Sequence, residues 1–173
     1  GRWVLPVMGD TLVTVNVSAF EAYFLRGDSV AWAGRAVVGE PFQQTPEFRA
    51  LLTYLVLNPT WTVPPKILTD ETLPAIQRDS TYLSRNNMVV VSPDGEAVDP
   101  ATINWDLYDG RTLPYRIVQQ PGGTNPLGRI KFVFPNAYAV YLHDTPARSL
   151  FQRPRRTFSH GCIRIERPMA LAD

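Results

Sequence analysis

The chain has 173 residues, of which 45% are hydrophobic and 19% are charged, and its formal net charge is +1 at pH 7. This length suits one well-formed hydrophobic core and is short for two. The near-neutral charge gives no electrostatic basis for binding nucleic acid, because phosphate recognition needs a basic face. No apolar run approaches the roughly 20 residues that a membrane-spanning helix requires. We therefore expect one domain, with no nucleic-acid partner and no membrane span in this sequence.

The ends of the sequence read as internal positions of a longer protein. It begins at Gly1 rather than at Met, and it stops at Asp173 in what reads as the start of a helix. Its single cysteine excludes an internal disulfide framework, and it has no glycine-rich phosphate loop. We expect residues 1–173 to be one domain of a longer polypeptide, and we expect it to need no cofactor.

The first forty residues predict neighbouring strands. Residues 13–17 alternate between valine and polar side chains, a period of two that is typical of a half-buried strand. Residues 22–25 and 30–33 flank a Gly-Asp turn and predict a hairpin. Residues 35–39 continue the sheet as far as a proline, which cannot donate a ladder hydrogen bond.

The middle of the chain changes character. Residues 51–57 form an apolar, partly β-branched run that predicts a central strand. From 61 to about 113 there are several prolines, helix candidates at 69–79 and 80–85, and a short strand at 88–91. We expect this stretch to be an inserted, partly helical subdomain.

Three further strands lead towards the C-terminal end. Residues 115–119, 130–134 and 139–142 have strand composition, and the last of these runs delivers His143 at a strand end. A loop that follows a strand can expose a catalytic group on a rigid scaffold. The whole pattern predicts a mostly β fold, a sandwich or small barrel, with its minor helices in the insertion.

The rarest reactive side chains of the chain are close together in sequence. Cys162 is the only cysteine, and the only two histidines, His143 and His160, lie within the same twenty residues. A free thiol needs a base or a positive neighbour to become a nucleophile, so this composition fits a Cys/His nucleophilic site. A lone cysteine is more often an inert core residue. A Cys/His/His set would also suit a zinc-dependent hydrolase with an open fourth metal position.

The order and spacing of these residues are more specific than their composition. His143 is followed by fifteen residues and then by Ser-His-Gly-Cys-Ile-Arg at 159–164. This pattern resembles the signature of the L,D-transpeptidase catalytic domain, the YkuD-type fold, whose members cross-link or trim bacterial peptidoglycan. Similarity extends from about Leu12 to the end of the chain.

Three segments make the resemblance strongest to the large periplasmic YcbB-type enzymes of this family. They are residues 58–65, 127–132 and 141–146. One position departs from the family pattern, because Glu166 stands where a neutral amide is expected.

The resemblance implies a cysteine-dependent acyltransferase in the periplasm of a Gram-negative bacterium. Cys162 would attack the L,D peptide bond of a tetrapeptide stem and release the terminal D-residue. The acyl group would pass to a diaminopimelate-type side-chain amine, which gives a 3-3 cross-link, or to water, which gives L,D-carboxypeptidase activity. Carbapenem-type β-lactams would acylate the same thiol, and the insertion at 61–113 would cap the groove. A non-catalytic peptidoglycan-binding module is the remaining alternative.

The resemblance also implies roles for individual residues. His143 would be the general base, held in one tautomer either by the backbone carbonyl or by the carboxylate of Asp144. If a strand begins at Gly161, His160 and Cys162 share one face of it. The amides of Gly161 and Cys162 would then form an oxyanion hole. The residues expected to bind substrate are Tyr141, Asp144, Ser159, His160 and Arg164.

Arginines are concentrated around this motif. Arg164 would hold a loop or a substrate carboxylate, or it would form an ion pair with Glu166 or Asp144. Four further arginines precede Cys162, and they would either attract a carboxylate-rich substrate or belong to a solvated loop. These four are Arg148, Arg153, Arg155 and Arg156.

Overall fold

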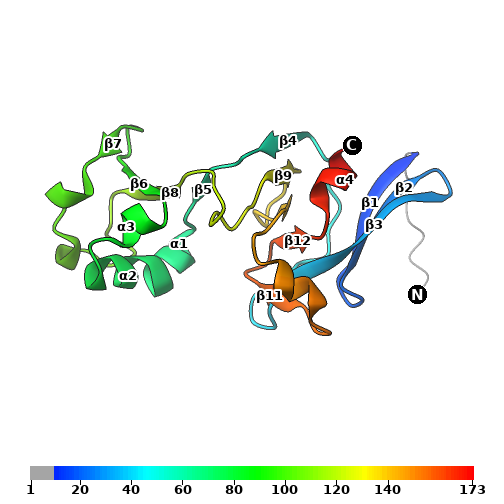
Figure 1. The fold of residues 1–173 in the computed structure, drawn as a ribbon, viewed down its shortest axis with the longest axis horizontal. Coiled ribbons are helices and arrows are strands. Elements are labelled where there is room, and N and C mark those ends of the chain that lie inside the picture. The colour runs from blue at the N-terminus through cyan, green and yellow to red at the C-terminus, as the bar shows by residue number, and fades with distance from the viewer. Residues whose placement is uncertain (1–9) are drawn as a thin grey trace. The chain divides into compact units, whose positions relative to one another are not determined.

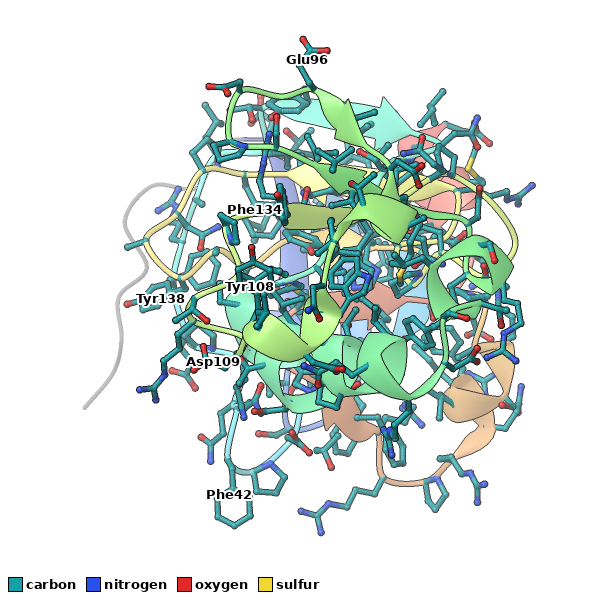
Figure 2. The ribbon with its side chains drawn as sticks, turned by 90° about the vertical axis from the view of Figure 1, so that its left-hand side faces the viewer. Phe42, Glu96, Tyr108, Asp109, Phe134 and Tyr138 are labelled. Atoms are coloured by element: carbon teal, nitrogen blue, oxygen red, sulfur yellow. The ribbon has the colours of Figure 1, made fainter. Side chains whose placement is uncertain are left out.

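The computed structural model describes residues 10–173 (Figures 1 and 2). The start of the expected domain at Gly1 lies outside this described part. The chain divides into two compact units, one from the chain up to Leu57 together with Ile130–Asp173, the other from Asn58–Arg129. The insertion expected at 61–113 lies inside the second unit. The unit extends beyond residue 113 because β8 (Arg116–Gln119) belongs to its sheet.

The first unit is built on one mixed sheet. Within residues 10–173, seven of its eight strands follow the order β1-β2-β3-β12-β10-β9-β4, and β11 pairs with β3 in parallel. All neighbours in this order are antiparallel except β10 and β12, which are parallel. The strands are β1 (Thr11–Asn16), β2 (Glu21–Arg26), β3 (Ser29–Gly39), β4 (Tyr54–Leu57), β9 (Ile130–Val133), β10 (Leu142–His143), β11 (Thr157–Ser159) and β12 (Ile163–Ile165). Two short helices, η4 (Arg148–Gln152) and α4 (Pro168–Ala172), complete the unit.

The N-terminal strands confirm the interpretation of residues 13–39. β1, β2 and β3 form an antiparallel meander, which Figure 1 shows in blue. Gly27 occupies the turn between β2 and β3 with a φ of 54°, a backbone conformation that glycine adopts without steric cost. The mostly β fold is therefore confirmed.

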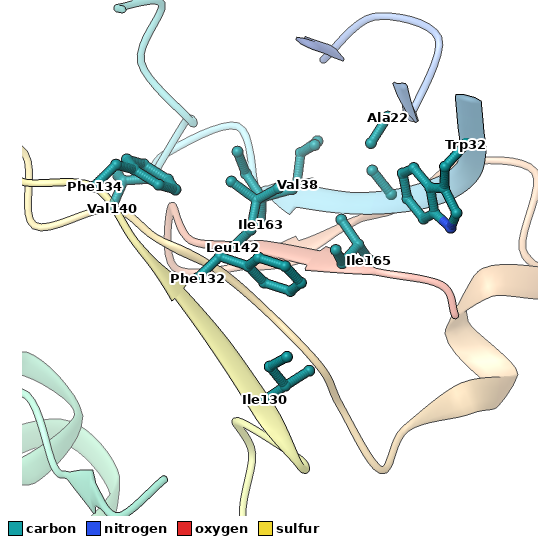
Figure 3. Close-up of a cluster of buried hydrophobic side chains, with 11 residues drawn as sticks. Ala22, Trp32, Val38, Ile130, Phe132, Phe134, Val140, Leu142, Ile163 and Ile165 are labelled. Atoms are coloured by element: carbon teal, nitrogen blue, oxygen red, sulfur yellow. The ribbon is translucent and has the colours of Figure 1, made fainter. Parts of the chain in front are cut away.

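One face of the inner strands packs into a hydrophobic core, shown in Figure 3. Its buried members are Ala22, Trp32, Ala36, Val38, Ile130, Phe132, Phe134, Val140, Leu142, Ile163 and Ile165. Burial of each larger side chain contributes about 1.5–3 kcal/mol. Because successive strand residues point to opposite faces, Lys131, His143 and Arg164 face away from this core.

The second unit has a sheet and a core of its own. Within the described residues, its strands follow the order β5-β8-β6-β7, with β5 at Trp61–Thr62, β6 at Met88–Val91 and β7 at Ala97–Val98. Its buried apolar residues are Val63, Leu68, Leu73, Ile76, Leu83, Met88, Val90 and Ile117. The strands predicted at 88–91 and 115–119 are therefore present.

The helices of the second unit lie close to their predicted positions. The helix expected at 69–79 begins earlier, because Pro65 occupies its first turn, a position where proline is tolerated. It runs through α1 (Pro65–Ile67), a π-helical turn η1 (Leu68–Thr72) and α2 (Leu73–Arg78). The others are α3 (Tyr82–Arg85), η2 (Pro100–Thr102) and η3 (Trp105–Leu107). Within residues 10–173, no helix has the length and apolar character needed to cross a membrane.

The prediction of a central strand at 51–57 is wrong. Only Tyr54–Leu57 forms a strand, β4, and β4 is the last strand of the sheet order, paired with β9 alone. Tyr54 and Leu57 are exposed, as are Leu51 and Leu52 before them. The apolar run specifies a strand, but its burial depends on neighbours that the local sequence does not encode.

Glu166 has a charged partner on a neighbouring strand. Arg35 of β3 forms two hydrogen bonds with its carboxylate, from Nε to Oε2 at 2.9 Å and from Nη2 to Oε1 at 2.8 Å. The same guanidinium also donates to the carbonyl of Phe151 at 3.0 Å. Arg35 therefore holds the pKa of the Glu166 carboxyl below its usual value. This pair gives a structural role to the acid at the position where the resemblance led us to expect a neutral amide.

We predict that Glu166→Gln lowers the free energy of unfolding by about 1 kcal/mol at neutral pH, because one of the two charge-assisted bonds is lost. Since the pKa of Glu166 is lowered in the folded protein, the ion pair contributes its full stabilisation at pH values above the usual carboxyl pKa of 4.5. It is lost as the pH falls through the lower folded value. Urea denaturation at a series of pH values from 7 to 3 measures this effect. The difference in free energy of unfolding between Glu166→Gln and the unsubstituted protein should fall towards zero as the pH is lowered.

Glu96→Gln is the matched control, because Glu96 projects into solvent (Figure 2). It should change stability by less than about 0.5 kcal/mol across the range. A pH-independent effect of Glu166→Gln would contradict the assignment.

Candidate active site

The register of three adjacent strands sets the positions of the polar side chains. His143 of β10 pairs with Lys131 of β9 on one side and with Arg164 of β12 on the other. Paired residues of neighbouring strands point to the same face. Lys131, His143 and Arg164 therefore form one row across the sheet, on the face opposite the core.

Cys162 lies in a turn and not on a strand. β11 ends at Ser159 and β12 begins at Ile163, so the strand predicted to start at Gly161 is wrong. Gly161 has a φ of 109°, which side-chain-bearing residues rarely adopt and which breaks the strand. The argument that His160 and Cys162 share a strand face fails for this reason, and His160 is exposed on the turn.

The hydroxyl of Ser159 closes this turn. It donates to the Cys162 carbonyl at 2.5 Å and accepts from the Gly161 amide at 3.2 Å. Ser159 is buried, so it shapes the backbone around Cys162 rather than lining an open groove. Because the Gly161 amide already has an acceptor, the expected two-amide oxyanion hole retains only the Cys162 amide as a candidate donor.

Thr45 fixes the turn from the other side, a role that the sequence analysis missed. Its hydroxyl donates to the Gly161 carbonyl at 2.8 Å and accepts from the Gly39 amide at 2.9 Å. The contact joins residues 116 positions apart, and no local pattern signals such a pair. The same loop exposes Phe42, whose ring points outward in Figure 2.

The thiol lies beside Tyr141. The Ile163 amide donates to the Tyr141 carbonyl at 3.1 Å, which places Cys162 next to Tyr141 across the parallel pair. Burial raises the pKa of the Cys162 thiol. The amide and hydroxyl of Tyr141 oppose this rise by hydrogen bonding, and the charges of Lys131 and Arg164 also oppose it. Burial is the largest of these effects, and it favours the neutral thiol.

His143 is buried and its ring is held in one orientation. Nδ1 donates to the backbone carbonyl of Asp144 at 2.5 Å, which leaves Nε2 unprotonated in the neutral ring. The ring centroid lies 5.5 Å from that of Tyr141. The Asp144 carboxylate pairs with Arg148 at 2.5 Å. Of the two groups of Asp144 that could orient the histidine, the backbone carbonyl makes the contact.

Arg164 does not form the ion pair that was one of its predicted roles. Glu166 is bound by Arg35, and Asp144 is bound by Arg148. Among residues 10–173, the buried Nε of Arg164 has no hydrogen-bond partner. Burial lowers the pKa of this guanidinium, and the nearby Cys162 partly offsets the effect.

The four arginines before Cys162 have different roles. Arg148 binds Asp144, and Arg156 donates to the carbonyls of Ala36 and Phe20, so these two hold the fold together. Arg153 and Arg155 are exposed. The expected attraction of an anionic substrate therefore rests on these last two.

A metal site and a surface cavity are the other features that could carry chemistry. Within the described residues, no group of three or more His, Cys, Asp or Glu side chains is arranged to hold a metal ion. The second unit has a surface cavity of about 680 Å³ lined partly by Lys66, Arg111 and Arg116. The described lining of that cavity contains no cysteine, serine or histidine. The face that carries Cys162 and His143 is the candidate active site.

The chain is similar in sequence to known proteins. A family model described as YkuD, L,D-transpeptidase catalytic domain, matches residues 10–173. A Haemophilus influenzae protein named "Putative L,D-transpeptidase" is 36% identical over 161 residues, which cover 93% of this chain and 32% of that protein. The chain thus spans about a third of that relative's length.

Two solved structures are also similar. One is the L,D-transpeptidase LdtMt1 in complex with imipenem, with a TM-score of 0.49 and 15% identity. The other is an L,D-transpeptidase from Mycobacterium smegmatis, with a TM-score of 0.47 and 17% identity. Each match covers 94% of this chain and 52% of the other.

We predict that Thr45→Val lowers the free energy of unfolding by about 1–3 kcal/mol, because it leaves the Gly39 amide and the Gly161 carbonyl buried without a partner. Urea denaturation measures the change. Thr53→Val is the control, since its exposed hydroxyl also donates to a carbonyl, that of Val133. The control should lose less than about 0.5 kcal/mol, and equal losses in both variants would contradict the role of Thr45.

Proposed function

Because the chain belongs to the L,D-transpeptidase catalytic domain family, we propose that it is a peptidoglycan L,D-transpeptidase whose nucleophile is Cys162. The observation that carries this proposal is the hydrogen bond from His143 Nδ1 to the Asp144 carbonyl, because His143 lies between Lys131 and Arg164, whose charges both act on Cys162. In the neutral ring this hydrogen bond leaves Nε2 of a buried imidazole able to accept a proton, in the region of the Cys162 thiol. Those are the two groups that a base-assisted thiol attack requires.

The first half-reaction acylates the enzyme. Nε2 of His143 takes the Cys162 proton as Sγ bonds to the carbonyl carbon of the L,D peptide bond of a tetrapeptide stem. The Cys162 amide stabilises the oxyanion that forms. The carbon–nitrogen bond then breaks, His143 returns the proton to the amine of the departing D-residue, and a thioester remains.

The second half-reaction transfers the acyl group. A diaminopimelate-type side-chain amine of another stem attacks the thioester, His143 accepts its proton, and Cys162 leaves as the thiolate. The product is a 3-3 cross-link. Water in place of the amine gives a trimmed stem, which is the L,D-carboxypeptidase side activity.

The neighbouring residues divide into those that contact substrate and those that shape the site. Tyr141, the exposed His160 and Arg164 are the proposed substrate contacts. Ser159 and the carboxylate of Asp144 are buried and already engaged, by the turn and by Arg148. We assign these last two the role of supporting the geometry of Cys162 and His143.

The proposed location is the periplasm of a Gram-negative bacterium, where the stem peptides of peptidoglycan are available. Incubation of the protein with a muropeptide digest, followed by mass spectrometry, tests the activity. A dimer joined through two diaminopimelate-type residues supports transpeptidation, and loss of the terminal D-residue alone supports trimming. An unchanged digest would reject both activities.

We predict that a carbapenem raises the intact mass of the protein by one inhibitor molecule, because the strained lactam carbonyl acylates Cys162. Cys162→Ala should show no adduct by the same mass measurement. An adduct that survives this substitution would assign the nucleophile to another residue.

We predict that His143→Ala slows carbapenem acylation of Cys162 by roughly 100-fold or more, the usual scale for loss of a positioned base. His160→Ala is the matched control, because it removes the other imidazole from an exposed position. It should weaken binding of a stem peptide more than it slows reaction of the thiol with iodoacetamide. If His160→Ala gives the larger loss of acylation, the two roles are reversed.

We also propose the capping role for the unit formed by Asn58–Arg129. The proposal rests on the family resemblance of this segment and on its separate sheet and core. Hydrogen exchange along 58–129 should slow when a carbapenem is bound to Cys162. Equal exchange with and without inhibitor would argue against a cap.

A further inference from the structure

Two cationic side chains flank His143 on the face that carries the thiol. Lys131 of β9 is opposite His143 in the antiparallel pair, and Arg164 of β12 is opposite it in the parallel pair. Both interact electrostatically with Cys162. The site therefore has a positive charge on each side of its histidine.

Neither cation is neutralised by a carboxylate of the described chain. Within residues 10–173, the acids closest to them in sequence are engaged elsewhere, Asp144 by Arg148 and Glu166 by Arg35. The ammonium of Lys131 lies 3.9 Å from the ring centroid of Tyr141, a cation–π contact that positions it without removing its charge. The buried Nε of Arg164 has no hydrogen-bond partner in this part of the chain.

Keeping charge away from water without a counter-ion is unfavourable, and here the partly buried Lys131 and the buried Nε of Arg164 both lack a carboxylate partner. Burial lowers the pKa of both Lys131 and Arg164, and Cys162 offsets this in each case. The neutral thiol that burial favours supplies no charge to balance them. A bound anion would satisfy both cations, and Arg164 and Lys131 donors suit a carboxylate.

We propose that Lys131 and Arg164 together form a carboxylate-binding site beside Cys162. Resting on the proposed function, its ligand is the α-carboxylate of the D-residue that leaves in the first half-reaction. In that substrate the carboxylate carbon is only three bonds from the carbonyl carbon that Sγ attacks. The site therefore selects stems whose cleavable bond is followed by one residue with a free carboxylate.

The test compares two alkylating reagents of nearly equal size on the intact protein. Iodoacetate carries a carboxylate, and iodoacetamide carries a neutral amide in its place. Both react only with the thiolate, so any change in the pKa of Cys162 cancels in the ratio of their rates. The ratio of iodoacetate to iodoacetamide rate constants should exceed that of a free cysteine peptide, and Lys131→Met should lower it by about fivefold or more.

Arg49→Gln is the matched control, because it removes an exposed arginine that lies outside the row and has no proposed role in substrate binding. It should leave the ratio unchanged within about twofold. Lys131→Arg, which keeps the charge, should restore most of the ratio, and Arg164→Gln should lower it as Lys131→Met does. Melting curves identify any variant that fails to fold, and the remaining variants of the set then decide the question.

Two results would overturn the proposal. In one, Lys131→Met lowers the rate constants of both reagents by the same factor, so that their ratio is unchanged. Lys131 would then stabilise the thiolate without binding a carboxylate. In the other, the ratio in the unsubstituted protein equals that of the free peptide. The reagents are not stem peptides, so the rate ratio tests the carboxylate site independently of the activity on peptidoglycan. A failure to cross-link or trim muropeptides would reject the proposed function without changing the result of the alkylation experiment.

Discussion

The alternation of side chains along β9, β10 and β12 is the constraint on which the candidate site depends. One face of these strands buries Phe132, Leu142 and Ile163 in the core, and each such burial contributes about 1.5–3 kcal/mol. A register slip of one residue would turn these side chains to the opposite face. The hydrophobic core therefore fixes where Lys131 and His143 project, although neither belongs to it.

The turn between β11 and β12 adds what the strands alone cannot provide. On a continuous strand, the backbone groups of Cys162 would be committed to ladder pairing. The positive φ of Gly161 interrupts the strand, and the hydroxyls of Ser159 and Thr45 bind the freed backbone groups of the turn. The amide of Cys162 lies outside the β12 ladder. Under the proposed mechanism, this turn would hold the nucleophile in place and leave the Cys162 amide available to a substrate oxygen.

Much of the strand pattern follows from local sequence, because a period of two reports which residues share a face. The strands at 13–17 and 130–134 were predictable on that basis. Pairing between strands was not, since it depends on contacts between segments far apart in the chain. The row of Lys131, His143 and Arg164 combines three strands in this way. The exposed edge strand β4 was misjudged for the same reason, because its composition is that of an interior strand.

The electrostatic arrangement around Cys162 suits a nucleophile that is charged only during reaction. Burial favours the neutral thiol, whereas Tyr141, Lys131 and Arg164 favour the thiolate. Under the proposed mechanism, His143 removes the thiol proton. The thiolate that forms is then destabilised by burial, and Tyr141, Lys131 and Arg164 partly offset this destabilisation. Those groups are already in place before the proton moves, so little reorganisation accompanies the appearance of charge. Under the proposed carboxylate site, the same cations would also contact the carboxylate of the leaving D-residue, so that one pair of side chains would serve both binding and chemistry.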